Sequence, residues 1–208
     1  GAAEFGNPML DAERSTGVDA VVRLHAGRAS GQLAAYHNRI AGYVFPATVG
    51  DTIVGGDVLP VVQYHQADAV LQGLEGSIEV AVTDALVLGF GGDVLLAERD
   101  DGTPLPFLPP ARVHVEARWD DGPWLLGATA RHAAARTEIS EGDETPTDAW
   151  TLLDLEAGFR LNRGEIRHSI TIAVENATNA LYRDATSRIK DFAPNPGRNV
   201  RLGYRVAF

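Results

Sequence analysis

The sequence predicts an all-β fold, an antiparallel transmembrane β-barrel. Three observations support this: segments that alternate apolar and polar residues, short turns that alternate with long loops, and a last strand that ends on an aromatic ring. In that strand five residues share one face: Val200, Leu202, Tyr204, Val206 and Phe208. Residues two apart in a strand point to the same side. A strand that is apolar on one side and polar on the other matches a barrel wall between lipid and a polar lumen.

Length and composition favour a single domain over residues 1–208. A chain of this length suits one all-β domain. No run approaches the ~18 uninterrupted apolar residues of a spanning helix, which argues against a helical membrane protein. The net charge of -10 argues against nucleic acid as a partner, because phosphate binding needs clustered Lys and Arg. Without cysteine there is no disulfide framework and no thiolate metal site.

The N-terminal half is expected to contain four strands. Apolar residues recur at every second position in three of them, while the strand over 32–44 alternates more weakly and its two faces are not assigned. Gly, Pro and Asn mark the connections between them. Gly27 to Gly31 supplies a tight turn, and Thr83 and Asp84 supply another. The predicted segments are an opening loop over 5–14, strands over 18–26, 32–44, 69–82 and 86–97, and a long connection over 45–63.

The C-terminal half is expected to contain five strands, of which the first is the clearest. Its apolar face carries Val113, Val115, Ala117 and Trp119, and its ionisable face carries Arg112, His114, Glu116 and Arg118. Exchanging the two faces would place each Arg in lipid at a cost of about 2–4 kcal/mol, so the register is firmly specified. The five strands are predicted over 112–119, 124–130, 153–161, 169–175 and 200–208, with long loops over 98–110, 133–149 and 176–199.

The order of the connections gives the chain a direction. Short turns alternate with long loops, as periplasmic turns alternate with extracellular loops in outer-membrane barrels, so we expect all the long loops outside the cell. About nine strands is an odd number, whereas bacterial single-chain barrels are even-numbered and closed. The chain also opens on Gly1 with no initiator Met and no leader, which is expected of a mature form or of a fragment of something longer. We therefore expect a part of a larger barrel.

Several segments carry a resemblance to a known family. They are EFGNPMLDAERS, HNRIAGYVF, QYHQADAVLQGLEG, LPFLPPAR, ETPTDAWTLLDLEAGFRL and VENATNALYRDATSRIKDFAPNPGRNVRLGYRVAF. In this order they resemble the C-terminal part of the β-barrel of TonB-dependent outer-membrane receptors. The run QADA–GLEG, LPPAR and ETPTDAWTLLDLE is most similar to the zinc-uptake subgroup, with haem and siderophore receptors close by. Trp150 departs from the family, which more often has Tyr there.

The resemblance implies a fold and a function. The chain would be about the last nine strands of a 22-stranded barrel with a plug in its lumen. The parent receptor would bind a metal ion or a metal chelate, such as zinc, a siderophore or haem, and import it with energy passed through TonB. Expected partners are outer-membrane lipid, the plug domain and remaining strands, and TonB through a region outside this chain. The barrel-assembly machinery would read Tyr204, Val206 and Phe208. No cofactor is implied.

Two sets of residues are candidate metal ligands. His132 lies near an acidic run that contains Glu138, Glu141, Asp143 and Glu144, and His65 lies near Asp68. Imidazole and carboxylate groups are common metal ligands. No spacing rule supports either set, and the alternative is a solvated acidic loop with a His at a strand end. His114 and His25 fall on the polar face, where a hydrogen-bonding role in the lumen is expected.

Charges on the polar face have two interpretations. Both signs are expected to pair across strands and to hold the plug, or else to line a substrate path. The residues are Glu75, Glu79, Asp93, Arg112, Glu116, Arg118, Asp154, Glu156, Arg160, Arg201 and Arg205. No nucleophile elbow or paired-acid spacing singles out a catalytic site, so no enzyme is predicted.

Two other functions stay open from the sequence. A small free-standing outer-membrane barrel or pore would need one more strand to close. A soluble β-sandwich binding module would require the apolar faces to meet each other instead of lipid.

Overall fold

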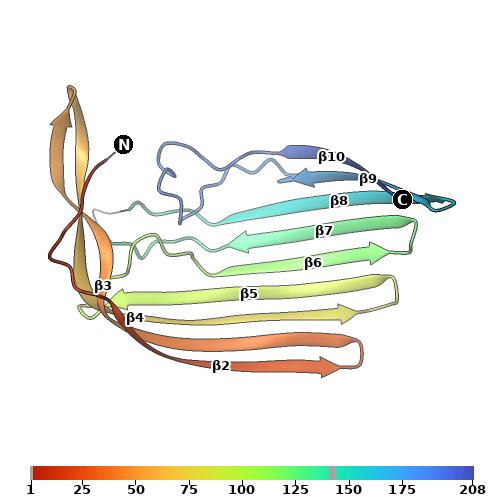
Figure 1. Cartoon of the computed structure of the whole chain (residues 1–208), viewed down its shortest axis with the longest axis horizontal. Helices are drawn as coiled ribbons and strands as arrows, with labels where there is room; N and C mark the ends of the chain where they lie inside the picture. Colours follow the sequence, from red (N-terminus) through yellow and green to blue (C-terminus); the bar gives the residue numbers. More distant parts are fainter. Residues whose placement is uncertain (1, 141–143) are drawn as a thin grey trace.

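A computed structural model describes residues 2–140 and 144–208. In this part of the chain it contains ten strands and no helix, so no helix is long and apolar enough to cross a membrane (Figure 1). The strands are β1 (Ala3–Phe5), β2 (Arg14–Ala26), β3 (Ala29–Val54), β4 (Asp57–Ala81), β5 (Leu86–Arg99), β6 (Arg112–Asp120), β7 (Trp124–Ala133), β8 (Trp150–Arg163), β9 (Ile166–Glu175) and β10 (Asn199–Ala207).

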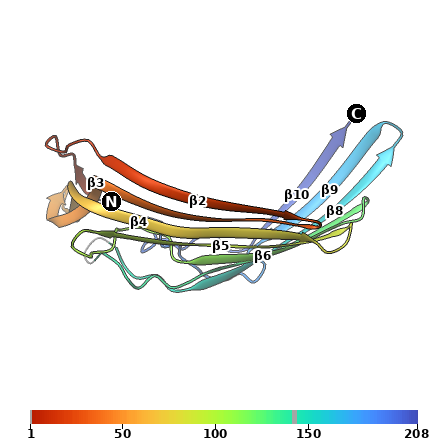
Figure 2. The ribbon, with the colours of Figure 1, turned by 90° about the horizontal axis from the view of Figure 1, so that it is seen from below.

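Nine of these strands form one antiparallel meander. β2 to β10 lie side by side in chain order, each paired with the next, which confirms the predicted nine-stranded sheet. β2 and β10 form its two edges, and within the described residues they do not pair with each other. The sheet is curved but unclosed (Figure 2). This is the arrangement expected of part of a larger barrel.

The two ends of the sheet differ in their connections. Four short turns lie at one end, the turn end, where Gly27 and Gly164 adopt the positive φ of 57° and 62° that tight hairpins require. At the opposite end, the long-loop end, lie three long connections, the outer loops (Figure 1). They are residues 100–111 between β5 and β6, 134–149 between β7 and β8, and 176–198 between β9 and β10. The predicted separation of turns from loops is confirmed.

The predicted long connection over 45–63 is wrong. β3 and β4 continue through it as a projecting hairpin, residues 42–68, which extends beyond the last pairs with β2 and β5. Gly50 lies at a register shift, Pro46 and Pro60 lie within the paired ribbon, and Gly55 and Gly56 form its tip. Pro and Gly at bulges and edges are compatible with a strand, so they did not mark a loop here.

The opening segment also differs from the predicted loop. Ala3–Phe5 forms β1, which pairs in parallel with β4 at 61–63, where β4 has no contact with β5. The following residues run across the projecting hairpin, and the Asn7 side chain donates to the Tyr64 carbonyl at 3.2 Å. β1 therefore covers an edge that would otherwise be unpaired.

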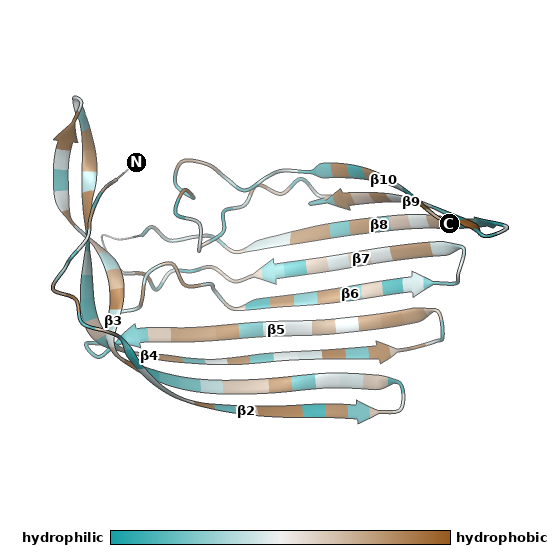
Figure 3. Ribbon diagram, viewed as in Figure 1, coloured by the Kyte–Doolittle hydropathy of each residue, from teal (hydrophilic) through white to brown (hydrophobic). Residues whose placement is uncertain are grey.

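The sheet is a single layer with little buried core. Apolar and polar residues alternate along the strands (Figure 3), and large apolar side chains such as Val115, Leu155 and Leu202 are exposed. The best-defined core lies near the long-loop end, where fully buried Leu105 packs on Ala69 and Ala97. No second sheet covers the apolar side of the described residues, so the β-sandwich alternative is wrong.

Candidate functional site

Strand pairing divides the sheet into a polar face and an apolar face. On β6, Val115 pairs with Phe90 and Ala130. The next residue, Glu116, points to the other side and pairs with Gly89 and Thr129. This alternation continues in register from β2 to β10. All the charged residues that the sequence assigned to the polar face share the side of Glu116.

Ion pairs connect neighbouring strands on the polar face. Arg118 spans two strands to reach Glu79 at 2.7 Å. The direct cross-strand pairs are Arg112–Asp93 at 2.9 Å, Arg131–Asp154 at 2.6 Å and Arg201–Glu175 at 2.6 Å. The predicted pairing of both signs is therefore confirmed. Because these groups are largely exposed, each pair contributes only about 0–1 kcal/mol.

Glycines leave room for rings on the polar face. A Cβ at Gly91 would overlap the His114 imidazole, and one at Gly73 would overlap the Tyr36 phenol. The structure thus places His114 on the polar face, as predicted, and His25, which pairs with Ser30, shares that face. At these two positions a ring from the neighbouring strand lies over the glycine, where a larger residue would not fit.

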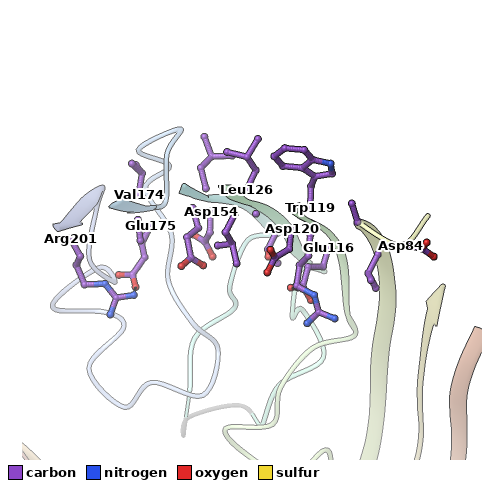
Figure 4. Close-up of a pocket in the computed structure, with 18 residues that line it drawn as sticks. Asp84, Glu116, Trp119, Asp120, Leu126, Asp154, Val174, Glu175 and Arg201 are labelled. Atoms are coloured by element: carbon purple, nitrogen blue, oxygen red, sulfur yellow. Dashed lines mark ion pairs between the residues drawn. The ribbon is translucent and has the colours of Figure 1, made fainter. Parts of the chain in front are cut away.

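A hollow of about 420 Å³ lies on the polar face between β6 and β10. Figure 4 shows Asp154, Glu175 and Arg201 on one side of the sheet there, and Trp119 and Leu126 on the opposite side. Six acidic residues line it against two arginines. They are Asp84, Glu116, Asp120, Asp154, Glu156 and Glu175, with Arg118 and Arg201. Five of these six carboxylates already lie within ion-pair distance of an arginine, which leaves Glu156 without an ionic partner among the described residues.

The apolar face carries aromatic side chains at the turn end. The Trp124 and Phe159 rings lie 4.7 Å apart, and His168 Nδ1 lies 2.7 Å from the Tyr204 hydroxyl. Aromatic girdles of this kind mark the membrane–water interface of barrels. Tyr204 and Val206 lie on the same face at the C-terminal strand, and Phe208 follows them, fully exposed. Their recognition by the assembly machinery stays a prediction.

The outer loops contain a charged network that the sequence reasoning missed. Lys190 and the Glu144 side chain are almost completely buried, with Nζ and Oε2 3.7 Å apart. Arg136 lies 3.5 Å from the other oxygen of Glu144. One signal was available, since Lys190 is the only lysine in the sequence. In the exposed part of these loops, hydrogen bonds from Thr103 hold the pKa of the Asp101 carboxyl below its usual value.

Among the described residues, His132 and the acidic run have different partners. β7 extends to Ala133, so His132 lies on the apolar face, paired with Val113 and with its Nδ1 2.9 Å from the Thr151 hydroxyl. Glu138 is exposed in the loop that follows. Glu144 is instead held by the buried cations described above, while Glu141 and Asp143 lie outside the described residues.

His65 and Asp68 also have separate partners. The His65 ring lies 6.2 Å from that of Phe45, whereas the Asp68 carboxylate accepts the Gly42 amide at 3.0 Å. No three His, Asp or Glu side chains in residues 2–140 and 144–208 are grouped as a metal site would require. The candidate ligands among the described residues therefore belong to no group of three.

Comparison with protein families identifies one match. The family model "TonB dependent receptor-like, beta-barrel" matches residues 1–179.

Solved structures give the same fold at low sequence identity. The copper transporter OprC superposes with a TM-score of 0.80 at 16% identity, over 95% of this chain and 32% of that one. A mutant of the ferric enterobactin receptor PfeA from Pseudomonas aeruginosa gives 0.70 at 17% identity, over 95% and 31%. The FrpB iron transporter from Neisseria meningitidis gives 0.70 at 14% identity, over 98% and 32%. The chain thus spans about a third of the length of these proteins.

Proteins of this family are bacterial outer-membrane transport receptors and not enzymes, which agrees with the predicted location and with the prediction that no catalytic site exists. The apolar face, the polar face and the segregated loops are the features that such a barrel requires. The chain belongs to the TonB-dependent receptor β-barrel family.

Proposed function

We propose that this chain is the C-terminal part of a receptor that imports a metal ion or a metal chelate across the outer membrane, energised through TonB. All of residues 1–208 would belong to a 22-stranded barrel. The plug and the segment that contacts TonB would lie in other parts of the parent. The observation that carries the proposal is a curved sheet with one lipid-compatible face, one charged face and all its long loops at one end.

The names of the structural neighbours support the substrate class. They include a copper transporter, a ferric enterobactin receptor and an iron transporter. Zinc, siderophores and haem, which the sequence resemblance suggested, all fall within this class. The open sheet favours a part of a receptor over a small free-standing pore, because an unclosed edge in lipid leaves backbone groups unpaired.

The distribution of charge favours a cationic substrate. Five segments form the long-loop end: residues 1–13, 42–68, 100–111, 134–149 and 176–198. They hold 15 of the 28 acidic residues and 5 of the 18 basic ones, a net charge of -10, while the remaining segments hold 13 of each and are neutral. Without Glu141 and Asp143 the long-loop end still has 13 acidic residues against 5 basic ones.

This asymmetry attracts cations to the long-loop end, which we place outside the cell. A surface of one sign raises the local concentration and the association rate of ligands of the opposite sign. We therefore expect a metal cation or a cationic complex to be preferred over an anionic chelate. His132, Glu138, His65 and Asp68 are candidate first contacts at this end, with further ligands supplied by the plug or by other loops of the parent.

The charged side chains of the polar face would hold the plug through individually weak ion pairs and hydrogen bonds. Its cross-strand ion pairs are exposed and individually weak, so they can exchange partners at little cost. Glu156 is exposed on this face and available to a plug.

Uptake by cells that carry the full-length parent receptor tests the proposal. We expect accumulation of a divalent metal such as zinc or copper, dependent on TonB and slower at raised ionic strength. Matched cells without TonB are the control. Failure to accumulate any free metal or metal chelate would overturn the proposed function. Preferential uptake of an anionic ferric siderophore would overturn only the preference for cations.

A further inference from the structure

The only lysine of the chain is buried among the outer loops. Lys190 belongs to the loop 176–198 and is 2% exposed. Its Nζ donates to the Thr145 carbonyl at 2.7 Å and to the Thr147 hydroxyl at 3.2 Å, both in the loop 134–149. A third donor reaches the Ala185 carbonyl at 3.5 Å within its own loop. Two of the three donors of this ammonium group therefore join the loop 176–198 to the loop 134–149, and the third stays within its own loop.

Glu144 continues the connection from the loop 134–149 to the loop 100–111. Its side chain is completely buried, and its Oε2 accepts the Phe107 amide at 3.0 Å. Arg136, also in the loop 134–149, lies 3.5 Å from Glu144 and donates to the Leu105 carbonyl at 3.0 Å. Glu144 and Arg136 of the loop 134–149 thus bind backbone groups of the loop 100–111.

The far end of this chain of contacts is fixed to the sheet. Leu105 is fully buried and its amide donates to the Ala97 carbonyl at 3.0 Å. It packs on Ala69 of β4 and on Ala97 of β5. The contacts therefore run without a break from the loop before β10 to β4 and β5, which lie several strands away in the sheet.

We propose that Lys190 and Glu144 form a latch that makes the three outer loops one cooperative block. Separating the loop 176–198 would leave the buried Lys190 without Glu144, and separating the loop 100–111 would leave Glu144 and Arg136 without the backbone groups that they bind. Either loss is more costly than losing an exposed ion pair. Opening is therefore shared by all three loops instead of occurring loop by loop. This inference concerns the loops alone and holds for any substrate.

Hydrogen exchange on the full-length receptor in detergent tests the latch, with Lys190→Met as the main variant. We expect exchange to accelerate by about 100-fold in the loops 134–149 and 100–111 as well as in 176–198, since a buried pair is broken. The strands β6 to β9 should keep their protection. The matched control is Arg188→Met in the same loop, which removes an exposed pair to Glu4 at 3.9 Å and a contact with Phe107, whose ring centroid lies 5.5 Å from the guanidinium. That variant should leave the loop 134–149 unchanged.

A second variant guards against a general loss of folding. Glu144→Gln keeps the size of the side chain and can still accept the Phe107 amide, but it removes the charge that faces Lys190 and Arg136. It should also accelerate exchange in all three loops. Faster exchange confined to the mutated loop in both variants would overturn the latch, and would leave the proposed transport function intact.

Discussion

The sheet and the outer loops are stabilised in different ways. The sheet relies on a backbone ladder and on exposed ion pairs that repeat from strand to strand, such as Arg112–Asp93. The outer loops rely on a few buried groups, namely Leu105, Glu144 and Lys190. Because similar ion pairs repeat across the sheet, losing one of them should cost little stability. Losing one of the few buried contacts in the outer loops should cost more. Substitutions in the sheet and in the outer loops test this difference.

The largest loss of stability is expected from Leu105→Ala. Removing a fully buried leucine side chain costs about 2–5 kcal/mol, because transfer energy is lost and a cavity remains. The loss should appear as faster proteolysis or exchange of the loop 100–111 in the full-length receptor. Leu108→Ala, at a partly buried neighbour of the same cluster, is the control and should have a smaller effect. Equal effects of the two variants would contradict the assignment of Leu105 as the anchor.

Placing a charge on the apolar face is expected to cause the next largest loss of stability. Val115→Arg should lower the free energy of unfolding in a lipid bilayer by about 2–4 kcal/mol, since Arg near the membrane centre loses its hydration. Thr129→Arg adds the same side chain to the polar face, next to Glu116, and should be nearly neutral. Chemical denaturation of the full-length receptor in vesicles measures both. If Thr129→Arg were the more harmful change, the assignment of the two faces would be wrong.

Removal of a polar-face ion pair is expected to have a small effect. Arg112→Ala breaks the contact with Asp93, which is partly exposed, and should cost at most about 1 kcal/mol. The same denaturation experiment, repeated at high salt, should show an even smaller difference. A loss of several kcal/mol would mean that this pair belongs to a tighter network than the distances indicate.

The Phe208 ring is expected to affect assembly into the outer membrane without affecting the free energy of unfolding. Phe208 is fully exposed, so Phe208→Ala removes no packing from the folded sheet. We expect an unchanged free energy of unfolding for the purified full-length receptor, but less of it in the outer membrane of cells. Leu202→Ala, also exposed on the apolar face of β10, is the control for a general loss of apolar surface. Normal membrane levels of the Phe208 variant would contradict the assembly signal.

The sequence alone was sufficient for most of the sheet. Alternation with period two is a local property, so it identified the nine strands of the meander and the two faces of all but the strand over 32–44. It failed at 45–63, where Pro46, Gly50 and Pro60 were interpreted as loop residues. These residues are tolerated because the projecting hairpin is a two-stranded ribbon whose edges need few further hydrogen bonds.

The site was less predictable because strand ends and loop contacts are not local. Predicting that β7 ended at Ala130 put His132 near the acidic run, and three more paired residues place it on the apolar face instead. The candidate ligands were chosen by nearness in sequence, which does not determine where side chains meet.

The pattern of residues two positions apart was enough to assign the lipid-facing and lumen-facing residues of most strands, and the order of short and long connections was enough to assign the end at which the loops lie. Only the tertiary structure decided that β3 and β4 project beyond the sheet and that the single lysine joins separate loops. Lys190 is more than 40 residues from Thr145 along the chain. A contact over that distance depends on how the strands between them pair and curve, and no local pattern encodes it.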